Sequence, residues 1–352
     1  MTSDGRIVSR GLRKVLCLSC GLVRDGLSFE AEDLSQHYGK HYQLNTTDSG
    51  EEHVFFTPNG PVPRSQFIHD WIRQIKPDIS GQVLEVGCGQ GSVLERLAAS
   101  FPRAQFRGID LSEDAVRRAR RKGLDVRLGE STNITDCYDT IVAIGVLEHV
   151  PSPTSFLKEL REHLTNGGDL IIAQPMQDVS SYDLFFVDHL HHFTTRHVQE
   201  FGQKAGLEQV AVLRGSALVP NFSLHRFKRA EHKNSGFRFE RPPSVQSIPE
   251  YLDAFSRINI FLRQHKKIAV FGTGEVFALL YAYTDLSRAE ITCGLDDNRD
   301  RRENHQWPFP VICPEEAPNR SVSDVLLSIN PRYNDTVSKR LQALGLTPAA
   351  IL

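Results

Sequence analysis

Short, largely apolar runs alternate with stretches of helical periodicity through the middle of the chain. The runs at 83–86, 106–109, 125–128, 138–143 and 169–173 have the length of buried strands. Apolar residues recur at helical spacing at 65–72, 93–98, 112–122 and 153–164. Strands that alternate with helices predict a doubly wound α/β fold with a mostly parallel sheet.

Capping and turn residues between these runs support the same elements. Ser112 is a plausible N-cap for the helix at 112–122, and residues 166–168 (Asn-Gly-Gly) are expected to stop the helix at 153–164. The first strand runs into Gly87, Gly89 and Gly91, and a helical pattern follows at once. A strand, a glycine-rich turn and a helix N-terminus form a nucleotide-binding element, and an acid at the end of the next strand can hold ribose hydroxyls.

The C-terminal third repeats this organisation. A helix is expected at 251–265, and strands are expected at 267–271, 291–295 and 325–329. The first strand leads into a Gly-Thr-Gly turn, but Phe277 stands where a dinucleotide fingerprint needs its third glycine. We interpret this part as a second, Rossmann-like accessory domain that binds or closes over a substrate, with a genuine second nucleotide site as the alternative. The predicted domains are a small N-terminal segment at 1–55, a core at 56–228 and the accessory domain at 245–352.

Composition and charge argue against several classes of protein. The chain has 352 residues and a net charge of −2, which argues against a protein-wide basic surface for nucleic acid or membrane. The N-terminus lacks the apolar core of a signal peptide, and no apolar run has transmembrane length. The six cysteines do not form a disulfide framework. We therefore expect a cytoplasmic protein, monomeric or homodimeric, that acts on a small molecule.

Cys17 and Cys20 form a C-x-x-C-G knuckle, which is half of a typical zinc site. His37 and His41 follow at H-x-x-x-H spacing and could complete it. The alternatives are a knuckle with free thiols and a simple turn. A structural zinc ion is thus a candidate cofactor here.

A loop after the last of the five strands carries Asp188, His189, His191 and His192. Histidine titrates near neutrality, so this cluster can supply a general base or a group that orients the substrate. Packing or solvated histidines are the second interpretation, and a bound metal ion is the third.

The ordered motifs E-V-G-C-G-Q-G, G-I-D-L-S, Y-D-T-I-V-A, V-L-E-H-V and L-T-N-G-G-D-L-I-I resemble those of class I S-adenosylmethionine-dependent methyltransferases. The resemblance implies that Gly87, Gly89 and Gly91 approach the cofactor and that Asp110 holds its ribose hydroxyls. It further implies that Leu111 flanks the adenine. Glu130 stands where the family often has an acid for the adenine amino group, and Glu85 is the acid of the first motif.

The pattern D-H-L-H-H-F-T resembles the E-H-x-x-Y-F-S loop of sugar C-methyltransferases, which also combine a cysteine-knuckle segment, a class I core and a Rossmann-like C-terminal domain. Those enzymes methylate C3 of nucleotide-linked 4-keto-deoxysugars. The resemblance implies that His189 is the general base, oriented by Asp188 or His192. Here Asp188 replaces the glutamate, His192 replaces the tyrosine, and one cysteine pair of the zinc site is absent. O- or N-methylation of another metabolite, a dehydrogenase activity at the C-terminal domain and a non-catalytic S-adenosylmethionine-binding protein are the alternatives.

Overall fold

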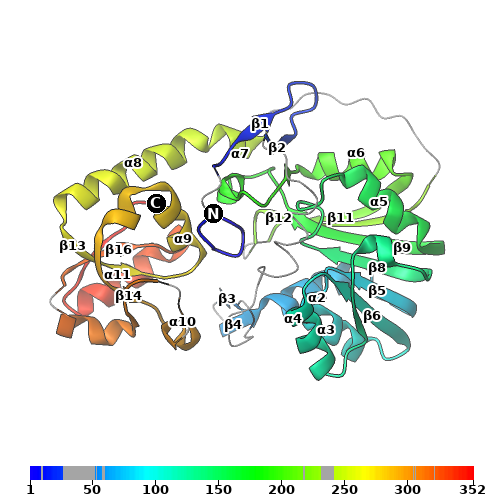
Figure 1. The fold of residues 1–352 in the computed structure, drawn as a ribbon, viewed down its shortest axis with the longest axis horizontal. Coiled ribbons are helices and arrows are strands. Elements are labelled where there is room, and N and C mark those ends of the chain that lie inside the picture. Colours follow the sequence, from blue (N-terminus) through cyan, green and yellow to red (C-terminus); the bar gives the residue numbers. More distant parts are fainter. Residues whose placement is uncertain are drawn as a thin grey trace. The chain divides into compact units, whose positions relative to one another are not determined.

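The computed structural model describes residues 1–8, 11–26, 52, 54–57, 60–216, 219–230, 242–303, 305, 307–320 and 322–352. The chain divides into two compact units, drawn in Figure 1. Of the described residues, 1–8, Gly11 and those from Ser247 onward form one unit. The remainder, from Leu12 to Gln246, form the other.

A seven-stranded sheet of described residues organises the larger unit, in the order β11-β12-β9-β8-β5-β6-β7. The strands are β5 (Gly81–Val86), β6 (Ala104–Asp110), β7 (Val126–Leu128), β8 (Tyr138–Ile144), β9 (Leu164–Pro175), β11 (Leu207–Arg214) and β12 (Phe222–Arg229). Neighbouring strands from β9 through β8, β5 and β6 to β7 are parallel, whereas β12 is antiparallel to both β9 and β11. The predicted doubly wound, mostly parallel α/β fold is confirmed.

Helices cover both faces of this sheet (Figure 1). They are α2 (Arg64–Ile75), α3 (Ser92–Ser100), α4 (Glu113–Arg121), α5 (Pro153–Glu162) and α6 (Thr195–Lys204). Ile72 of α2 and Leu97 of α3 belong to one buried cluster, and Leu157 of α5 and Val198 of α6 belong to another. Each fully buried aliphatic side chain stabilises the fold by about 1.5–3 kcal/mol, so both faces of the sheet are held by apolar packing.

Two predicted element ends can be compared directly with the structure. The hydroxyl of Ser112 accepts a hydrogen bond from Ala115 N at 3.3 Å, as expected of an N-cap. Asn-Gly-Gly at 166–168 was expected to stop the helix at 153–164, but α5 ends at Glu162, and β9 begins at Leu164 and includes the glycines. Tyr138 of β8 pairs with Leu164 and Thr140 pairs with Asp169, so the ladder is irregular here and residues 165–168 lie between the two pairs.

An N-terminal hairpin packs with the larger unit. Its strands, β1 (Lys14–Leu16) and β2 (Val23–Asp25), flank the Cys17–Cys20 knuckle, and β2 pairs with β10 (His191–His192). Residues 1–8 belong to the smaller unit instead, where the terminal amine of Met1 donates to the Tyr283 hydroxyl at 3.0 Å. Residues that we expected in a single N-terminal segment therefore lie in two different units. A separate hairpin, β3 (Val54–Thr57) and β4 (Gly60–Pro63), precedes α2.

The smaller unit contains a second parallel sheet of five described strands, in the order β15-β14-β13-β16-β17. Its strands are β13 (Lys267–Phe271), β14 (Glu290–Leu295), β15 (Val311–Ile312), β16 (Asp324–Leu327) and β17 (Thr347–Ala349). Its longer helices are α8 (Ile248–Gln264), α9 (Glu275–Tyr283) and α11 (Asn334–Ala343). Among the described residues of the whole chain, no helix combines the length and the apolar character that a membrane span requires.

Candidate functional site

The glycine loop follows the carboxyl end of β5. Gly87, Gly89 and Gly91 all have positive φ angles, of 70°, 54° and 77°, which L side chains adopt at a cost. A Cβ atom at Gly87 would lie 2.5 Å from Val146, and one at Gly91 would lie 2.4 Å from Leu124. A Cβ at Gly89 would meet no atom within 4 Å. Gly89 is therefore the position at which the main chain of this loop borders open space.

Asp110 ends β6 and fixes the glycine loop. Its Oδ2 accepts a hydrogen bond from Gly89 N at 2.7 Å, and its Oδ1 accepts one from Ser112 N at 2.8 Å. Burial raises the pKa of Asp110, while these two backbone donors act in the opposite direction. A carboxylate has about four lone-pair sites, so each oxygen can accept a further hydrogen bond from a ligand hydroxyl.

Three other predicted cofactor residues have different surroundings. Glu85 is 3% exposed, and its Oε2 has no hydrogen-bond partner among the residues described. Burial, with Asp110 nearby, raises the pKa of Glu85 to about 8. Leu111 directly follows Asp110 and is half-buried. Glu130 is exposed at the start of a short 3₁₀ turn, where its Oε1 accepts from the Thr132 hydroxyl at 2.9 Å.

Asp183, which the sequence did not single out, is the residue on which the histidine loop converges. His189 Nδ1 lies 2.5 Å from Asp183 Oδ1, and His192 Nδ1 lies 2.6 Å from Asp183 Oδ2. Gln177 Nε2 also donates to Oδ2, at 2.8 Å. Asp183 thus lies between the two histidines, and the orienting role expected of Asp188 or His192 stays a prediction. The main-chain carbonyl of Asp188 accepts from His149 Nδ1 at 3.0 Å.

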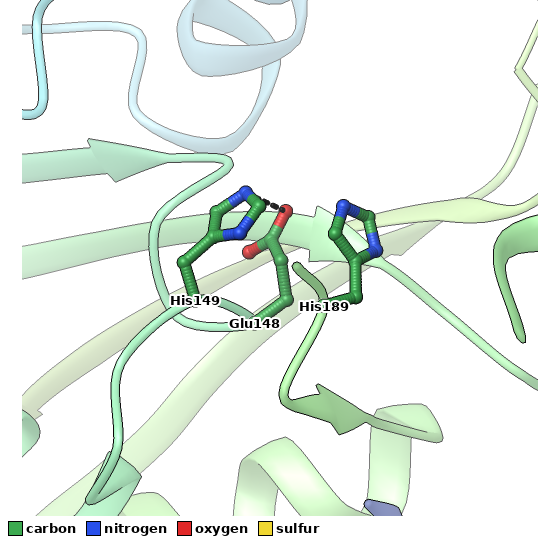
Figure 2. A group of neighbouring side chains, drawn as sticks. All are labelled: Glu148, His149 and His189. Carbon is green, nitrogen blue, oxygen red and sulfur yellow. Dashed lines mark ion pairs between the residues drawn. The ribbon is translucent and has the colours of Figure 1, made fainter. Parts of the chain in front are cut away.

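Glu148 and His149 lie beside His189, although they come from the loop after β8. The titratable atoms of the three side chains lie within 4.8 Å of one another, and Figure 2 shows the side chains gathered at one point. The rings of His149 and His189 meet edge to face with centroids 4.7 Å apart. Two main-chain hydrogen bonds join the segments, from Leu190 N and His191 N to the Glu148 carbonyl, at 2.8 and 3.2 Å. The arrangement is therefore fixed by the backbone as well as by side chains.

Burial and neighbouring charges shift the pKa values of the side chains in this cluster in different directions. Burial alone would lower the pKa of His189, but the Asp183 carboxylate raises it to about 9. Burial alone would raise the pKa of Asp183, but the two imidazoles beside it hold it well below its usual range. Burial raises the pKa of Glu148 to about 7 and lowers that of His149 to about 4. Near pH 7 the site thus holds an Asp183–imidazolium pair next to Glu148, whose carboxyl group is about half ionised.

Comparison with known proteins assigns the part of the chain that carries the glycine loop. Residues 84–170 match the family model for a methyltransferase domain. They form a class I S-adenosylmethionine-dependent methyltransferase domain. The match begins within β5, includes the glycine loop, Asp110 and Glu148, and ends within β9.

Individual methyltransferases match part of this chain. The trans-aconitate 2-methyltransferase of Afipia carboxidovorans is 32% identical over 117 residues, which cover 32% of this chain and 45% of that protein. The ubiquinone biosynthesis O-methyltransferase of Bordetella bronchiseptica is 35% identical over 109 residues, which cover 28% and 44%. The chain thus spans less than half the length of these two relatives. The structure of magnesium protoporphyrin IX methyltransferase from Synechocystis PCC 6803 is similar at a TM-score of 0.39 and 18% identity, over 47% of this chain and 82% of that one.

Outside the matched methyltransferase domain lie the histidine loop and the N-terminal knuckle. The knuckle is a tight turn in which Gly21 N donates to the Cys17 carbonyl at 2.8 Å, and no disulfide joins Cys17 to Cys20. The other two candidate zinc ligands, His37 and His41, lie outside the described residues. The N-terminal hairpin nevertheless contacts this region, because the Cys20 carbonyl accepts from His197 Nε2 of α6 at 2.9 Å and Lys14 Nζ of β1 donates to the His189 carbonyl at 2.7 Å.

The smaller unit has its own glycine turn after β13. Gly272 has a φ of 86°, and Thr273 donates through both its amide and its hydroxyl to Asp296 Oδ2, at 2.9 and 2.8 Å. A Cβ at Gly274 would lie 2.3 Å from the Arg301 guanidinium, and Phe277 is fully buried. An arginine side chain therefore occupies the space beside this second turn.

Proposed function

We propose that this protein transfers the methyl group of S-adenosylmethionine to a small-molecule acceptor, and that the acceptor is a nucleotide-linked keto sugar. The observation that carries the proposal is the buried Asp183–His189 pair, which lies with Glu148 beyond the carboxyl end of β8. Methylation of carbon beside a ketone requires both a proton acceptor and a group that stabilises an enolate. A hydroxyl or amine acceptor is already nucleophilic, so its methylation does not require a group that stabilises an enolate.

The residues at the glycine loop fit S-adenosylmethionine. The loop borders open space at Gly89, so a ligand can approach its main chain there. Asp110 retains lone pairs for ribose hydroxyls, and the unpartnered Oε2 of Glu85 lies in the same strand-end region. When bound, the cofactor supplies a methyl group on a positively charged sulfur.

His189 is the histidine that we propose contacts the acceptor. The family resemblance gives it the role of general base, which requires a neutral imidazole. Asp183 raises the pKa of His189 to about 9, so the neutral form becomes abundant only as the pH approaches that value. At lower pH, the ion-paired imidazolium is a strong hydrogen-bond donor instead.

A panel of acceptors tests the proposal. Purified protein and S-adenosylmethionine are incubated with nucleotide-linked 4-keto sugars, a phenol and a carboxylic acid, and S-adenosylhomocysteine and methylated product are measured by mass spectrometry. We expect turnover with a keto sugar, and no cofactor binding by calorimetry in an Asp110→Ala control. Turnover confined to the phenol would favour O-methylation, which is the named reaction of the ubiquinone-pathway relatives. Cofactor binding without turnover of any acceptor would favour a non-catalytic protein.

A further inference from the structure

Glu148 is a buried acid whose environment is unusual for a structural residue. Its side chain is 3% exposed, and its Oε2 has no hydrogen-bond partner within the described part of the chain. A buried polar atom without a partner destabilises a fold, so such atoms are rare and concentrate at functional sites. The contact drawn in Figure 2 joins Oε1 to His149 Nε2 at 4.0 Å, which is too long for a hydrogen bond, and His149, with a pKa of about 4, is neutral near pH 7.

The backbone holds Glu148 at the catalytic edge of the sheet. It follows β8, which is the parallel neighbour of β5 and therefore of the glycine loop. Ligands of open parallel sheets bind beyond the carboxyl ends of such strands. Gly145, with a φ of 68°, turns the chain so that a Cβ there would lie 3.7 Å from Glu148 Oε1. The Glu148 carbonyl accepts both amides that follow His189, which fixes the acid and the histidine relative to each other.

The groups that face Glu148 define what it can do. They are His149 from its own loop, His189 and Asp183 from the histidine segment, and Arg64 from the start of α2. His189 Nδ1 lies 2.5 Å from Asp183 Oδ1 but lacks hydrogen-bond geometry there, so the pair is an electrostatic one. In the imidazolium both ring nitrogens carry a proton, and Nε2–H is the donor that does not face Asp183. Glu148 and His189 thus offer an acceptor and a donor side by side.

We propose that Glu148 is the general base of the reaction and that His189 is the hydrogen-bond donor to the substrate oxygen. This assignment rests on the proposed function, namely methylation of a carbon beside a ketone. The C–H bond breaks, its proton passes to a Glu148 oxygen, and its electron pair forms the enolate, whose oxygen is held by His189 Nε2–H. The enolate carbon then bonds to the methyl group while the C–S bond breaks. The electron pair stays on sulfur, the C=O bond is restored, and Glu148 returns its proton to solvent.

The protonation states support this division of roles. With a pKa of about 7, Glu148 is ionised above neutrality, and with a pKa of about 9 His189 keeps its proton up to that value. Both groups are therefore in the required form between about pH 7 and 9. In the reverse assignment His189 would have to be neutral, and the rate would rise until the pH reached about 9.

The test separates proton removal from methyl transfer. With S-adenosylhomocysteine bound, exchange of the acceptor proton beside the ketone for solvent deuterium is followed by NMR, and methyl transfer is assayed separately. For Glu148→Gln we expect both rates to fall by about 10²-fold or more, with the dissociation constant for S-adenosylmethionine within about threefold of wild type. Glu148→Asp should recover part of the exchange. The matched control is Glu162→Gln, at an exposed glutamate of α5, which should leave both rates unchanged.

Each outcome bears on one claim. A bell-shaped wild-type profile with limbs near pH 7 and 9, losing its acid limb in Glu148→Gln, supports the assignment. Two outcomes overturn the assignment of Glu148 as the base and leave keto-sugar methylation standing. One is undiminished proton exchange in folded Glu148→Gln, and the other is a wild-type methyl-transfer rate that only rises toward pH 9. Loss of cofactor binding in Glu148→Gln would make Glu148 a cofactor residue and also overturn it. A wild-type protein that methylates no keto sugar removes the proposed function, and this inference with it.

Discussion

Asparagine at position 183 would keep the shape of the side chain and remove its charge, so Asp183→Asn isolates the electrostatic part of the Asp183–His189 pair. In the wild-type site His189 is 4% exposed and lies 2.5 Å from the carboxylate. Burial disfavours an imidazolium, and the carboxylate is what outweighs that effect. Without the charge, burial should dominate, and the pKa of His189 should fall below 6.5. The neighbouring His149, which is 7% exposed, has a pKa of about 4.

The size of the effect follows from the pKa of His189. A rise from 6.5 to about 9 is about 2.5 units, which at about 1.4 kcal/mol per unit corresponds to about 3 kcal/mol of folding free energy. Because the folded-state pKa is raised, this contribution is complete below pH 6.5 and is lost as the pH rises toward 9. Asp183→Asn should therefore lower the free energy of unfolding by about 3 kcal/mol at pH 6 and by clearly less at pH 9.

NMR titration of the His189 ring proton gives the pKa directly, with His189→Gln to assign the resonance, and denaturant unfolding at pH 6 and 9 gives the free energies. Asp188→Asn is the matched control, because Asp188 raises the pKa of His189 less than Asp183 does. A His189 that still titrates near pH 9 in Asp183→Asn would refute the electrostatic reasoning. So would an equal loss of stability at the two pH values.

Two further predictions concern the glycine loop and the knuckle. Gly89→Ala should weaken S-adenosylmethionine binding at least about tenfold in calorimetry with a loss of stability of about 1–2 kcal/mol, because its Cβ enters open space at a φ of 54°. Gly87→Ala should mainly lower the melting temperature, because its Cβ meets Val146 at 2.5 Å, and equal behaviour of the two variants would contradict the loop geometry. If Cys17 and Cys20 bind zinc, elemental analysis should find one ion per chain, lost in Cys17→Ser together with thermal stability. A folded wild-type protein without zinc would make the knuckle a plain turn.

Local patterns predicted the core of the larger unit because its elements depend on nearby residues. The strand ending in Asp110 and the Ser112 cap were both visible as an apolar run followed by a polar residue of the right type. The glycine loop was predicted for a related reason, since positive φ angles at alternate positions require glycine. The start of β9 was missed because Leu164 pairs with Tyr138 across an irregular, glycine-containing stretch that has no local strand pattern.

The acid–base cluster could be predicted only in part. His189 was found through its histidine-rich surroundings, whereas Asp183 lies six positions earlier in a stretch that reads as an apolar loop. Glu148 was visible only as part of a motif, because its proximity to His189 depends on hydrogen bonds between segments forty residues apart. A usable signal did exist, since Glu148 and His149 form a polar pair just after a buried strand. The pairing of β10 with β2 joins still more distant segments and left no local pattern.

The boundary of the methyltransferase domain divides the site into two parts with different origins. The glycine loop, Asp110 and Glu148 lie within residues 84–170, while Asp183 and His189 lie beyond them. His189 is held from three directions, by Asp183, by the Glu148 carbonyl through the amides that follow it, and by Lys14 of the N-terminal hairpin. The glycine loop and Asp110 therefore belong to the matched domain, whereas the acid–base cluster combines Glu148 of that domain with residues on both sides of it. Variants in the histidine loop should accordingly alter acceptor choice and leave cofactor affinity largely intact.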